Sequence, residues 1–425
     1  MIIVDTALAQ RASEGNPLRV AMVGAGFSGQ TVAYQIVKSF PGIQLVAISN
    51  RRVDRARGAY ERASISDVLE VSTPSQLDQA IADKRYAVTS DPSVIWQAQG
   101  VEAIIEATGT IEFGCHVVSN AIDHRKHVVL LNVELDSTLG PILKVRADKA
   151  GVIITNTDGD EPGVAMNMAR FVRSIGLEPV VAGNLKGFYD PYRTPKTQEA
   201  FAAQHNQKPK AVTSYADGTK LSMELTVLAN ALRFRVAKRG MYGPSLEHVD
   251  ESSEFFRDKL IGGGMVDFLV GAAPGNGAFV LGFSEDPFRR DYLKYLKMGN
   301  GPLYVFYTPF HLPQLEVPLT VARAALLGDA TVTPQGPPSC DSIAIAKRDL
   351  KAGELLDGLG GFTCYGLIDN FDSSREIGAL PIGVSEGCHL VRDVPKDEVV
   401  RYEDVRLPEG RLCDELRSQM EEMSH

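Results

Sequence analysis

The sequence predicts an α/β protein: a Rossmann-type doubly wound parallel sheet, then an α+β substrate domain and a small β-rich C-terminal module. Three observations predict this. Buried-strand patterns alternate with helical spacing over about the first 160 residues. That rhythm changes near residue 164, where longer loops and Gly-rich turns begin. Finally, the Pro-rich segment 333–339 precedes a tail with two similar strand-and-turn runs.

The composition is that of a multidomain globular protein. The chain has 425 residues, 44% hydrophobic and 23% charged, which is too long for one ordinary core. A net charge of −9 without a long basic cluster argues against a nucleic-acid partner. No apolar run reaches membrane-spanning length, and the five cysteines include no CxxC pair. We therefore expect a cytoplasmic protein without a membrane partner.

These changes in the pattern of strands and helices divide the chain into three expected domains. Residues 1–162 form the cofactor domain, which a returning helix at about 314–332 completes. Residues 163–313 form the substrate domain. The tail, residues 338–425, forms the β-rich module. Within the substrate domain, the run 211–232 predicts a strand, an Asp-Gly turn and a helix.

The stretch 18–52 predicts a nucleotide-binding unit. An apolar run ends in the turn Gly-Ala-Gly-Phe-Ser-Gly, and helical spacing and a second apolar run follow. In this context G-x-G-x-x-G places a pyrophosphate at the N-terminus of the helix, whereas a chance glycine turn is the alternative. The turn residues expected to bind the cofactor are Gly24, Gly26, Phe27, Ser28 and Gly29.

The end of the second strand indicates which cofactor binds. It reads Ser49, Asn50, Arg51 and Arg52, without the acidic residue that usually binds a free ribose 2′-hydroxyl. Guanidinium groups bind a 2′-phosphate well, so the sequence favours NADP over NAD. The alternative is that the two arginines only solvate the start of a helix.

Ligands of doubly wound sheets lie beyond the carboxyl ends of the strands. Two further strand ends therefore supply expected cofactor contacts. These are Ala107, Thr108 and Gly109 after one apolar run, and Asn132 and Glu134 after the next.

Lys186 is the expected catalytic donor. It follows an apolar strand and stands before a glycine, so its ammonium group can enter a cleft and stabilise a developing alkoxide. We expect desolvation to lower its pKa towards neutrality. An exposed loop lysine is the alternative.

A tight acidic group follows the sixth predicted strand. Asp160 and Glu161 are expected to be catalytic, orienting Lys186, and Asp158 is expected to bind substrate hydroxyls. Carboxylates this close need a cation or hydrogen-bond donors, so a divalent metal is possible, although not favoured. The alternative is a helix N-cap ahead of Pro162.

Four more residues are expected to contact the substrate. Tyr189, Asp190 and Arg193 follow Lys186 on one loop, where Arg193 is suited to a carboxylate or phosphate. His311 lies between two prolines and is suited to move protons, although a structural hydrogen bond is the alternative.

Several motifs resemble known families. GAGFSG, IIEATG and HVVLLNVE resemble the cofactor domain of the homoserine dehydrogenase superfamily, and the tail from Ser342 to Val405 resembles a SAF domain, a β-clip module. With GDEPG and GPLYVFYTPFHLPQLEVPLTVAR between them, the chain is similar to the 1-deoxy-D-xylulose 5-phosphate reductoisomerase-like proteins of some bacteria. The resemblance implies a homodimer or homotetramer.

The resemblance also implies an activity. Homoserine dehydrogenases usually end their fifth strand in Thr-Ala-Asn-Lys, whereas this chain has Leu130-Leu-Asn-Val133, so homoserine oxidation is not expected. We expect an NADP-dependent oxidoreductase acting on a small hydroxy or keto compound (a sugar phosphate, polyol or sugar acid), and the resemblance extends to a reductoisomerase. The alternative is a non-catalytic NADP(H) sensor whose tail binds a ligand or partner.

Overall fold

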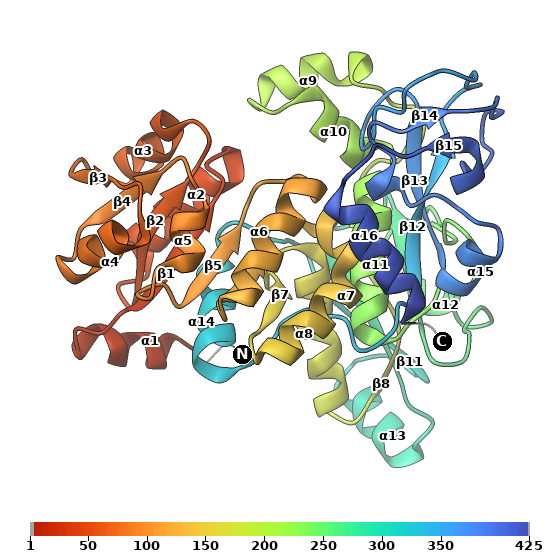
Figure 1. The fold of residues 1–425 in the computed structure, drawn as a ribbon. Helices are drawn as coiled ribbons and strands as arrows, with labels where there is room; N and C mark the ends of the chain where they lie inside the picture. Colours follow the sequence, from red (N-terminus) through yellow and green to blue (C-terminus); the bar gives the residue numbers. More distant parts are fainter. Residues whose placement is uncertain (1–3, 424–425) are drawn as a thin grey trace. The chain divides into compact units, whose positions relative to one another are not determined.

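The computed structural model describes residues 4–423, and the chain divides into two compact units (Figure 1). Unit 1 runs from the N-terminus to Asp160 and adds Leu312–Thr333. Unit 2 consists of Glu161–His311 and Pro334 to the C-terminus. The substrate segment and the tail therefore lie in the same unit. Among the described residues, no helix combines the length and apolar character needed to cross a membrane.

Unit 1 is built on a seven-stranded sheet in the order β3-β4-β2-β1-β5-β6-β7. All of its ladders are parallel, and the order reverses beside β1, as in Rossmann-type sheets. This confirms the predicted fold class. The strands are β1 (Leu18–Val23), β2 (Ile43–Ser49), β3 (Val68–Glu70), β4 (Tyr86–Thr89), β5 (Ala103–Glu106), β6 (His127–Leu130) and β7 (Ile154–Asn156).

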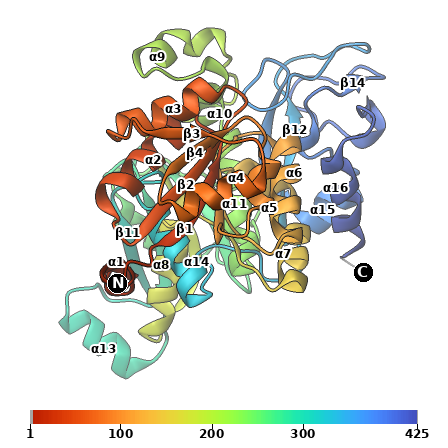
Figure 2. The same ribbon diagram turned by 60° about the vertical axis from the view of Figure 1, so that its left-hand side comes forward.

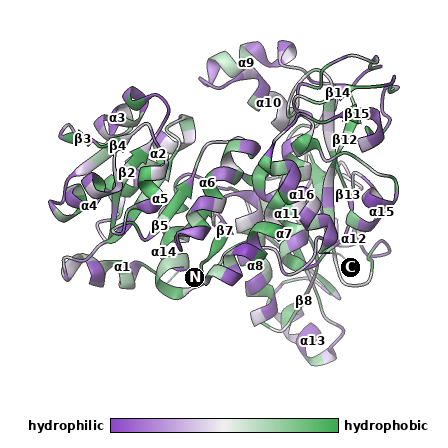
Figure 3. Cartoon of the chain, viewed as in Figure 1, coloured by the Kyte–Doolittle hydropathy of each residue, from purple (hydrophilic) through white to green (hydrophobic). Residues whose placement is uncertain are grey.

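Helices cover this sheet because each presents an apolar stripe to it. Val32 and Ile36 of one helix pack in the same buried cluster as Val20 and Met22 of β1. In Figure 3 the central strands of unit 1 are hydrophobic, while α3 and α4 carry hydrophilic outer turns. The helices are α1 (Val4–Ser13), α2 (Phe27–Ser39), α3 (Val53–Arg62), α4 (Pro74–Ala82), α5 (Ser93–Gln97), α6 (Ile111–Asp123), α7 (Val133–Ala150) and α14 (Val317–Leu327).

Most predicted elements of unit 1 are present. The N-terminal helix is α1, although residues 1–3 lie outside the described part, and the returning helix is α14, which belongs to unit 1. The helix predicted at 141–150 is the second half of α7, which begins at Val133 because Asn132 caps it. Strands β3 and β4 were missed because they are short and follow polar helical runs.

Unit 2 contains a four-stranded sheet in the order β11-β10-β8-β9, in which only β8 and β9 run parallel. Helices α8 and α11 pack against it. Its strands are β8 (Glu178–Lys186), β9 (Met265–Val270), β10 (Ala278–Phe283) and β11 (Leu303–Thr308). The helices of this segment are α8 (Glu161–Ser174), α9 (Glu199–Gln204), α10 (Pro209–Ala216), α11 (Thr219–Leu232), α12 (Ser252–Phe255) and α13 (Pro287–Tyr295).

One prediction in this segment is wrong. The run before the Asp-Gly turn is the helix α10, not a strand. A short run with Val212, Thr213 and Tyr215 does not distinguish strand from helix, and Pro209 at the first helical position favours the helix. The turn itself and the helix α11 after it are present as predicted, with the side chain of Asp217 accepting the backbone N–H of Thr219.

The tail is a β-rich module that packs on α11. Its strands β12 (Cys340–Ala346) and β13 (Cys364–Asn370) form an antiparallel pair, and β14 (His389–Leu390) pairs with β15 (Val405–Arg406). Isolated bridges such as Ile345↔Val399 join further segments to the first pair. Helices α15 (Phe371–Glu376) and α16 (Leu412–Glu422) complete it (Figure 2). Its likeness to a SAF domain stays a prediction.

Candidate functional site

The glycine turn of unit 1 has the geometry of a dinucleotide-binding turn. Gly24 has a φ of 110°, and a Cβ there would lie 2.4 Å from the carbonyl oxygen of Ala107. A Cβ at Gly29 would lie 2.4 Å from the carbonyl oxygen of Gly24, so both positions require glycine. Gly26, the N-cap of α2, has no atom within 4 Å of its Cβ position. The open backbone at Gly26 therefore fits a closely approaching pyrophosphate.

The end of β2 supports this turn. Asn50 Oδ1 accepts the backbone N–H of Ala25 at 3.1 Å, and its Nδ2 donates to the carbonyl oxygen of Arg52 at 2.8 Å. Arg51 and Arg52 are exposed, and the Arg52 guanidinium pairs with Asp54 at 2.8 Å. Asn50 thus stabilises the glycine turn, and the Arg52 guanidinium that was predicted to bind a 2′-phosphate is paired with Asp54.

The ends of β5 and β6 carry buried polar groups. The Glu106 carboxylate accepts the backbone N–H of Thr108 at 2.9 Å, and burial raises the pKa of Glu106 to about 7. Asn132 accepts the N–H of Leu135 at 3.2 Å and donates to the carbonyl oxygen of Thr110 at 2.9 Å. Asn132 therefore caps α7 and joins two strand ends, while Glu106 was not predicted from the sequence.

All predicted cofactor residues lie in unit 1, at the carboxyl ends of β1, β2, β5 and β6. Because these strands are parallel neighbours, their ends meet at one edge of the sheet. The remaining residues predicted to bind the cofactor are the exposed Phe27, Ser28 at the start of α2, the buried Ser49, Gly109 with a φ of 65°, and Glu134 in the first turn of α7.

Asp158 is held inside unit 1. Its side chain is fully buried and forms an ion pair with Arg323 of α14. Its other oxygen accepts the hydroxyls of Thr320 at 2.8 Å and Thr331 at 2.7 Å. These contacts favour a structural role, in which Asp158 fastens α14 to unit 1, over the predicted contact with substrate.

In unit 2, Lys186 lies between two buried carboxylates. Its Nζ is 2.8 Å from Glu161 Oε1, at the start of α8, and 3.4 Å from Glu224 Oε2, in the middle of α11. Asn184, two residues earlier on β8, donates its Nδ2 to the same Glu224 oxygen at 2.9 Å. We call Glu161, Asn184, Lys186, Glu224 and His311 the lysine cluster.

The lysine cluster overturns the predicted direction of the Lys186 pKa. Burial disfavours the ammonium form, but the two carboxylates together outweigh burial and raise the pKa of Lys186 above its ordinary value. The prediction of a lowered pKa is wrong because it counted desolvation without Glu161 and Glu224. Lys186 is therefore a cation at neutral pH that donates hydrogen bonds.

His311 completes the lysine cluster. Its Nε2 lies 3.5 Å from Glu161 Oε2, and its Nδ1 is buried without a hydrogen-bond partner. Burial lowers the pKa of His311, which favours the neutral imidazole. A neutral ring beside a carboxylate can accept or donate a proton, as expected for a residue that moves protons.

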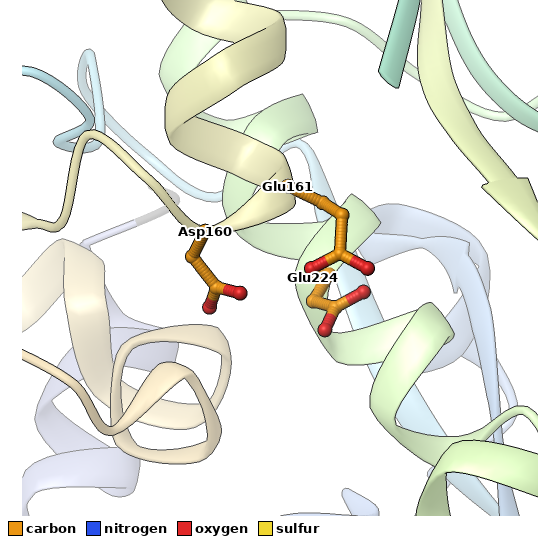
Figure 4. A group of neighbouring side chains, drawn as sticks. All are labelled: Asp160, Glu161 and Glu224. Carbon is orange, nitrogen blue, oxygen red and sulfur yellow. The ribbon is translucent and has the colours of Figure 1, made fainter. Parts of the chain in front are cut away.

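The carboxylates of Glu161 and Glu224, together with that of Asp160, could also bind a metal ion. Figure 4 shows Glu161 and Glu224 side by side, with Asp160 preceding Glu161 in the chain, and oxygens of the three lie within 4.8 Å of one another. Such oxygens suit a hard divalent ion. However, the Lys186 ammonium already supplies positive charge to Glu161 and Glu224. The arrangement therefore does not require a metal.

The predicted substrate residues after Lys186 interact with one another and with the fold. Tyr189 packs against the ring of Phe268, with centroids 5.5 Å apart, and burial raises the pKa of Tyr189 to about 12. Asp190 pairs with Arg193 at 3.0 Å, and the Arg193 guanidinium lies over the Phe188 ring.

Two members of the lysine cluster were missed from the sequence. Glu224 is the single charge in the run LSMELTVLANAL, and Asn184 is the single polar side chain in VVAGNL. Both are buried in the structure. A lone polar residue in a buried element must find a partner, so this pattern was a usable signal for a site.

The middle segment of the chain matches a known protein family. Residues 159–317 match the family described as oxidoreductase DRL, catalytic domain. This match covers less than half of the chain and includes the GDEPG motif and the whole lysine cluster. The segment is therefore similar to an oxidoreductase catalytic domain, which agrees with the predicted enzyme class. No curated protein matches the chain.

Several solved structures are distantly similar. A probable dehydrogenase from Thermotoga maritima is 16% identical over 74% of this chain and 90% of that one, with a TM-score of 0.43. A homoserine dehydrogenase from Thiobacillus denitrificans is 15% identical over 80% and 83%, with a TM-score of 0.42. A DOX-P reductoisomerase in complex with NADPH, fosmidomycin and magnesium is 17% identical over 50% and 57%, with a TM-score of 0.35. Similarity this low does not indicate the substrate or the cofactor of this protein.

Proposed function

We propose that this protein is an NADP-dependent oxidoreductase acting on a small hydroxy or keto compound, such as a sugar phosphate, polyol or sugar acid. The observation that carries the proposal is the Lys186 ammonium held between Glu161 and Glu224, within a segment that matches an oxidoreductase catalytic domain. A fixed cation suits the negative charge that develops on a carbonyl oxygen during reduction.

The residues of unit 1 fit a dinucleotide. The backbone at Gly26 is open, and the N-terminus of α2 can bind the pyrophosphate. Arg51 and Arg52 suit a 2′-phosphate, and the ends of β5 and β6 suit the nicotinamide half. NADPH, when bound, supplies the hydride.

The lysine cluster supplies the proton chemistry. Lys186 donates a hydrogen bond to the substrate oxygen and stabilises the alkoxide that forms there. Lys186 gives the alkoxide a proton and regains one from solvent, and His311, neutral beside the Glu161 carboxylate, relays that proton. Glu224 and Asn184 keep the ammonium in place.

The proposal also covers the substrate contacts, a coupled rearrangement and the oligomeric state. Tyr189, Asp190 and Arg193 bind the substrate's oxygens or anionic group. Reduction coupled to rearrangement of the carbon skeleton, as in a reductoisomerase, is supported by the motif resemblance of the chain. A cytoplasmic homodimer or homotetramer without nucleic-acid or membrane partners is the expected state.

The test is a comparison of wild type, Lys186→Ala and the control Lys196→Ala, whose lysine is exposed at the start of a short 3-10 helix further along the chain. NADPH affinity is measured by fluorescence titration. NADPH consumption is measured with a panel of sugar phosphates, ketoses and keto sugar acids, and NMR of the products detects skeletal rearrangement. We expect Lys186→Ala to lose about a thousandfold in turnover with unchanged NADPH affinity, while Lys196→Ala behaves as wild type. Turnover that survives Lys186→Ala contradicts the proposal, and binding of NADPH by a wild type without turnover supports the sensor alternative.

A further inference from the structure

The segment directly after Lys186 has no helix or strand of its own until residue 196. We call residues 187–195 the lysine loop. It carries Tyr189, Asp190 and Arg193, which the proposed function assigns to substrate binding. A loop of this kind must be held by contacts from elsewhere if its side chains are to stay in place beside Lys186.

A buried lysine of the C-terminal module contacts this loop. Lys347 follows β12 and is 5% exposed. Its Nζ donates to the carbonyl oxygen of Arg193 at 2.7 Å, to that of Gly361 at 2.8 Å, and to Asp217 Oδ2 at 2.9 Å. These three acceptors match the three donors of an ammonium group. One side chain thus joins the lysine loop, the tail and the turn before α11, the helix that carries Glu224.

A second contact holds the tip of the loop. The Tyr192 hydroxyl donates to Asp397 Oδ2 at 2.9 Å, and the Tyr365 hydroxyl of β13 donates to Asp397 Oδ1 at 3.2 Å. The Lys396 ammonium lies 3.7 Å from the centroid of the Tyr192 ring. Asp397 thus accepts hydrogen bonds from one tyrosine of the loop and one of the tail.

We propose that the C-terminal module positions the lysine loop for substrate binding, with Lys347 and Asp397 as positioning residues that act through the loop. The inference rests on the proposed function of Lys186 and its neighbours, and it assigns a role to the C-terminal module. We expect the module to act on substrate affinity rather than on the hydride step, because Lys347 and Asp397 contact the loop directly.

The test uses the full chain and two mild variants, Asp397→Asn and Tyr192→Phe. Each weakens or removes the hydrogen bonds between Tyr192 and Asp397 while keeping side-chain size. The matched control is Asp393→Asn, whose carboxylate pairs with Lys351 at 2.8 Å in the same module, away from the loop. Hydrogen–deuterium exchange of peptides covering 187–195 reports the order of the loop, and KM and kcat are measured with the substrate identified from the panel.

We expect amide exchange of the loop to quicken about fivefold in both mild variants, and no more in the double variant, because they break the same contact. KM rises about fivefold, kcat stays within about twofold, and NADPH affinity is unchanged. Asp393→Asn behaves as wild type. Lys347→Met, checked for folding by circular dichroism because Asp217 loses its cation, has a larger effect in the same direction.

Two results overturn the inference: loop exchange that does not change in the mild variants, or faster exchange without a rise in KM. Faster exchange in a protein that turns over no substrate contradicts the proposed function instead, and leaves the contact between module and loop supported.

Discussion

The glycine turn of unit 1 and the lysine cluster of unit 2 are built in opposite ways. The turn presents backbone and open space, and its residues other than Phe27 have small side chains or none. The lysine cluster presents the partly buried ammonium of β8 between two buried carboxylates of α8 and α11. The turn therefore depends on shape, whereas the cluster depends on charge balance.

This difference teaches which changes each site tolerates. An added methyl group should damage the turn at every glycine. At Gly24 and Gly29 it would clash with the backbone, and at Gly26 it would fill the space that the proposed pyrophosphate needs. A change of charge without a change of volume is decisive in the cluster, because burial makes an unbalanced charge costly. The predictions below test this contrast.

The largest effect is expected at Gly24. Gly24→Ala places a methyl group against the Ala107 carbonyl at a positive φ, so we expect a loss of about 3 kcal/mol in unfolding free energy and no measurable NADPH binding. Gly26→Ala is the matched control, since its Cβ meets nothing within 4 Å. That variant should keep its stability within about 1 kcal/mol and still bind NADPH at least tenfold more weakly. Urea unfolding and fluorescence titration measure both, and equal stability of the two variants contradicts the shape argument.

In the lysine cluster, Glu224→Gln removes a charge at constant volume. We expect kcat to fall about tenfold to a hundredfold. The pKa of Lys186 falls because one of the two carboxylates that raise it is gone, so the alkaline limb of the pH–kcat profile moves to lower pH. The exposed Glu254→Gln serves as control. A profile that does not move shows that Glu224 does not set the charge of Lys186.

A charge effect is also expected beside the turn, at Glu106. Burial raises its folded-state pKa from 4.5 to about 7, so the folded state binds this proton more tightly than the unfolded state. Stability therefore falls as pH rises between those values, by about 1.4 kcal/mol per pH unit for this group. Glu106→Gln removes this contribution and flattens the dependence, measured by urea unfolding at several pH values. The exposed Asp67→Asn should keep the wild-type slope, and an unchanged slope in Glu106→Gln contradicts the assignment.

The smallest effect is expected at the exposed pair of Arg52 and Asp54. Asp54→Asn frees the guanidinium for a 2′-phosphate, so NADPH affinity should rise about threefold while NADH affinity stays the same. Titration with both cofactors measures the ratio. A parallel change for NADPH and NADH shows that Arg52 does not contact the 2′-phosphate.

Much of unit 1 was predictable because its signals are local. The run from β1 to β2 contains the apolar strands, the glycines and the helical spacing within about 35 residues, and periodicity alone determines these elements. The strand predicted in place of α10 shows the limit, because short β-branched runs are ambiguous until packing and Pro209 decide between strand and helix.

What the sequence by itself determined is the parallel sheet, the glycine turn and the position of Lys186 at the end of a strand. The sequence also predicted Glu161 as a residue that orients Lys186, whereas only the tertiary structure brought Glu224 beside them. Glu161, Glu224 and His311 come from separate elements, and their proximity reverses the expected direction of the Lys186 pKa. The physical reason is that periodicity reports how a segment faces its core, whereas the charge state of a buried group depends on distances to residues far away in the chain.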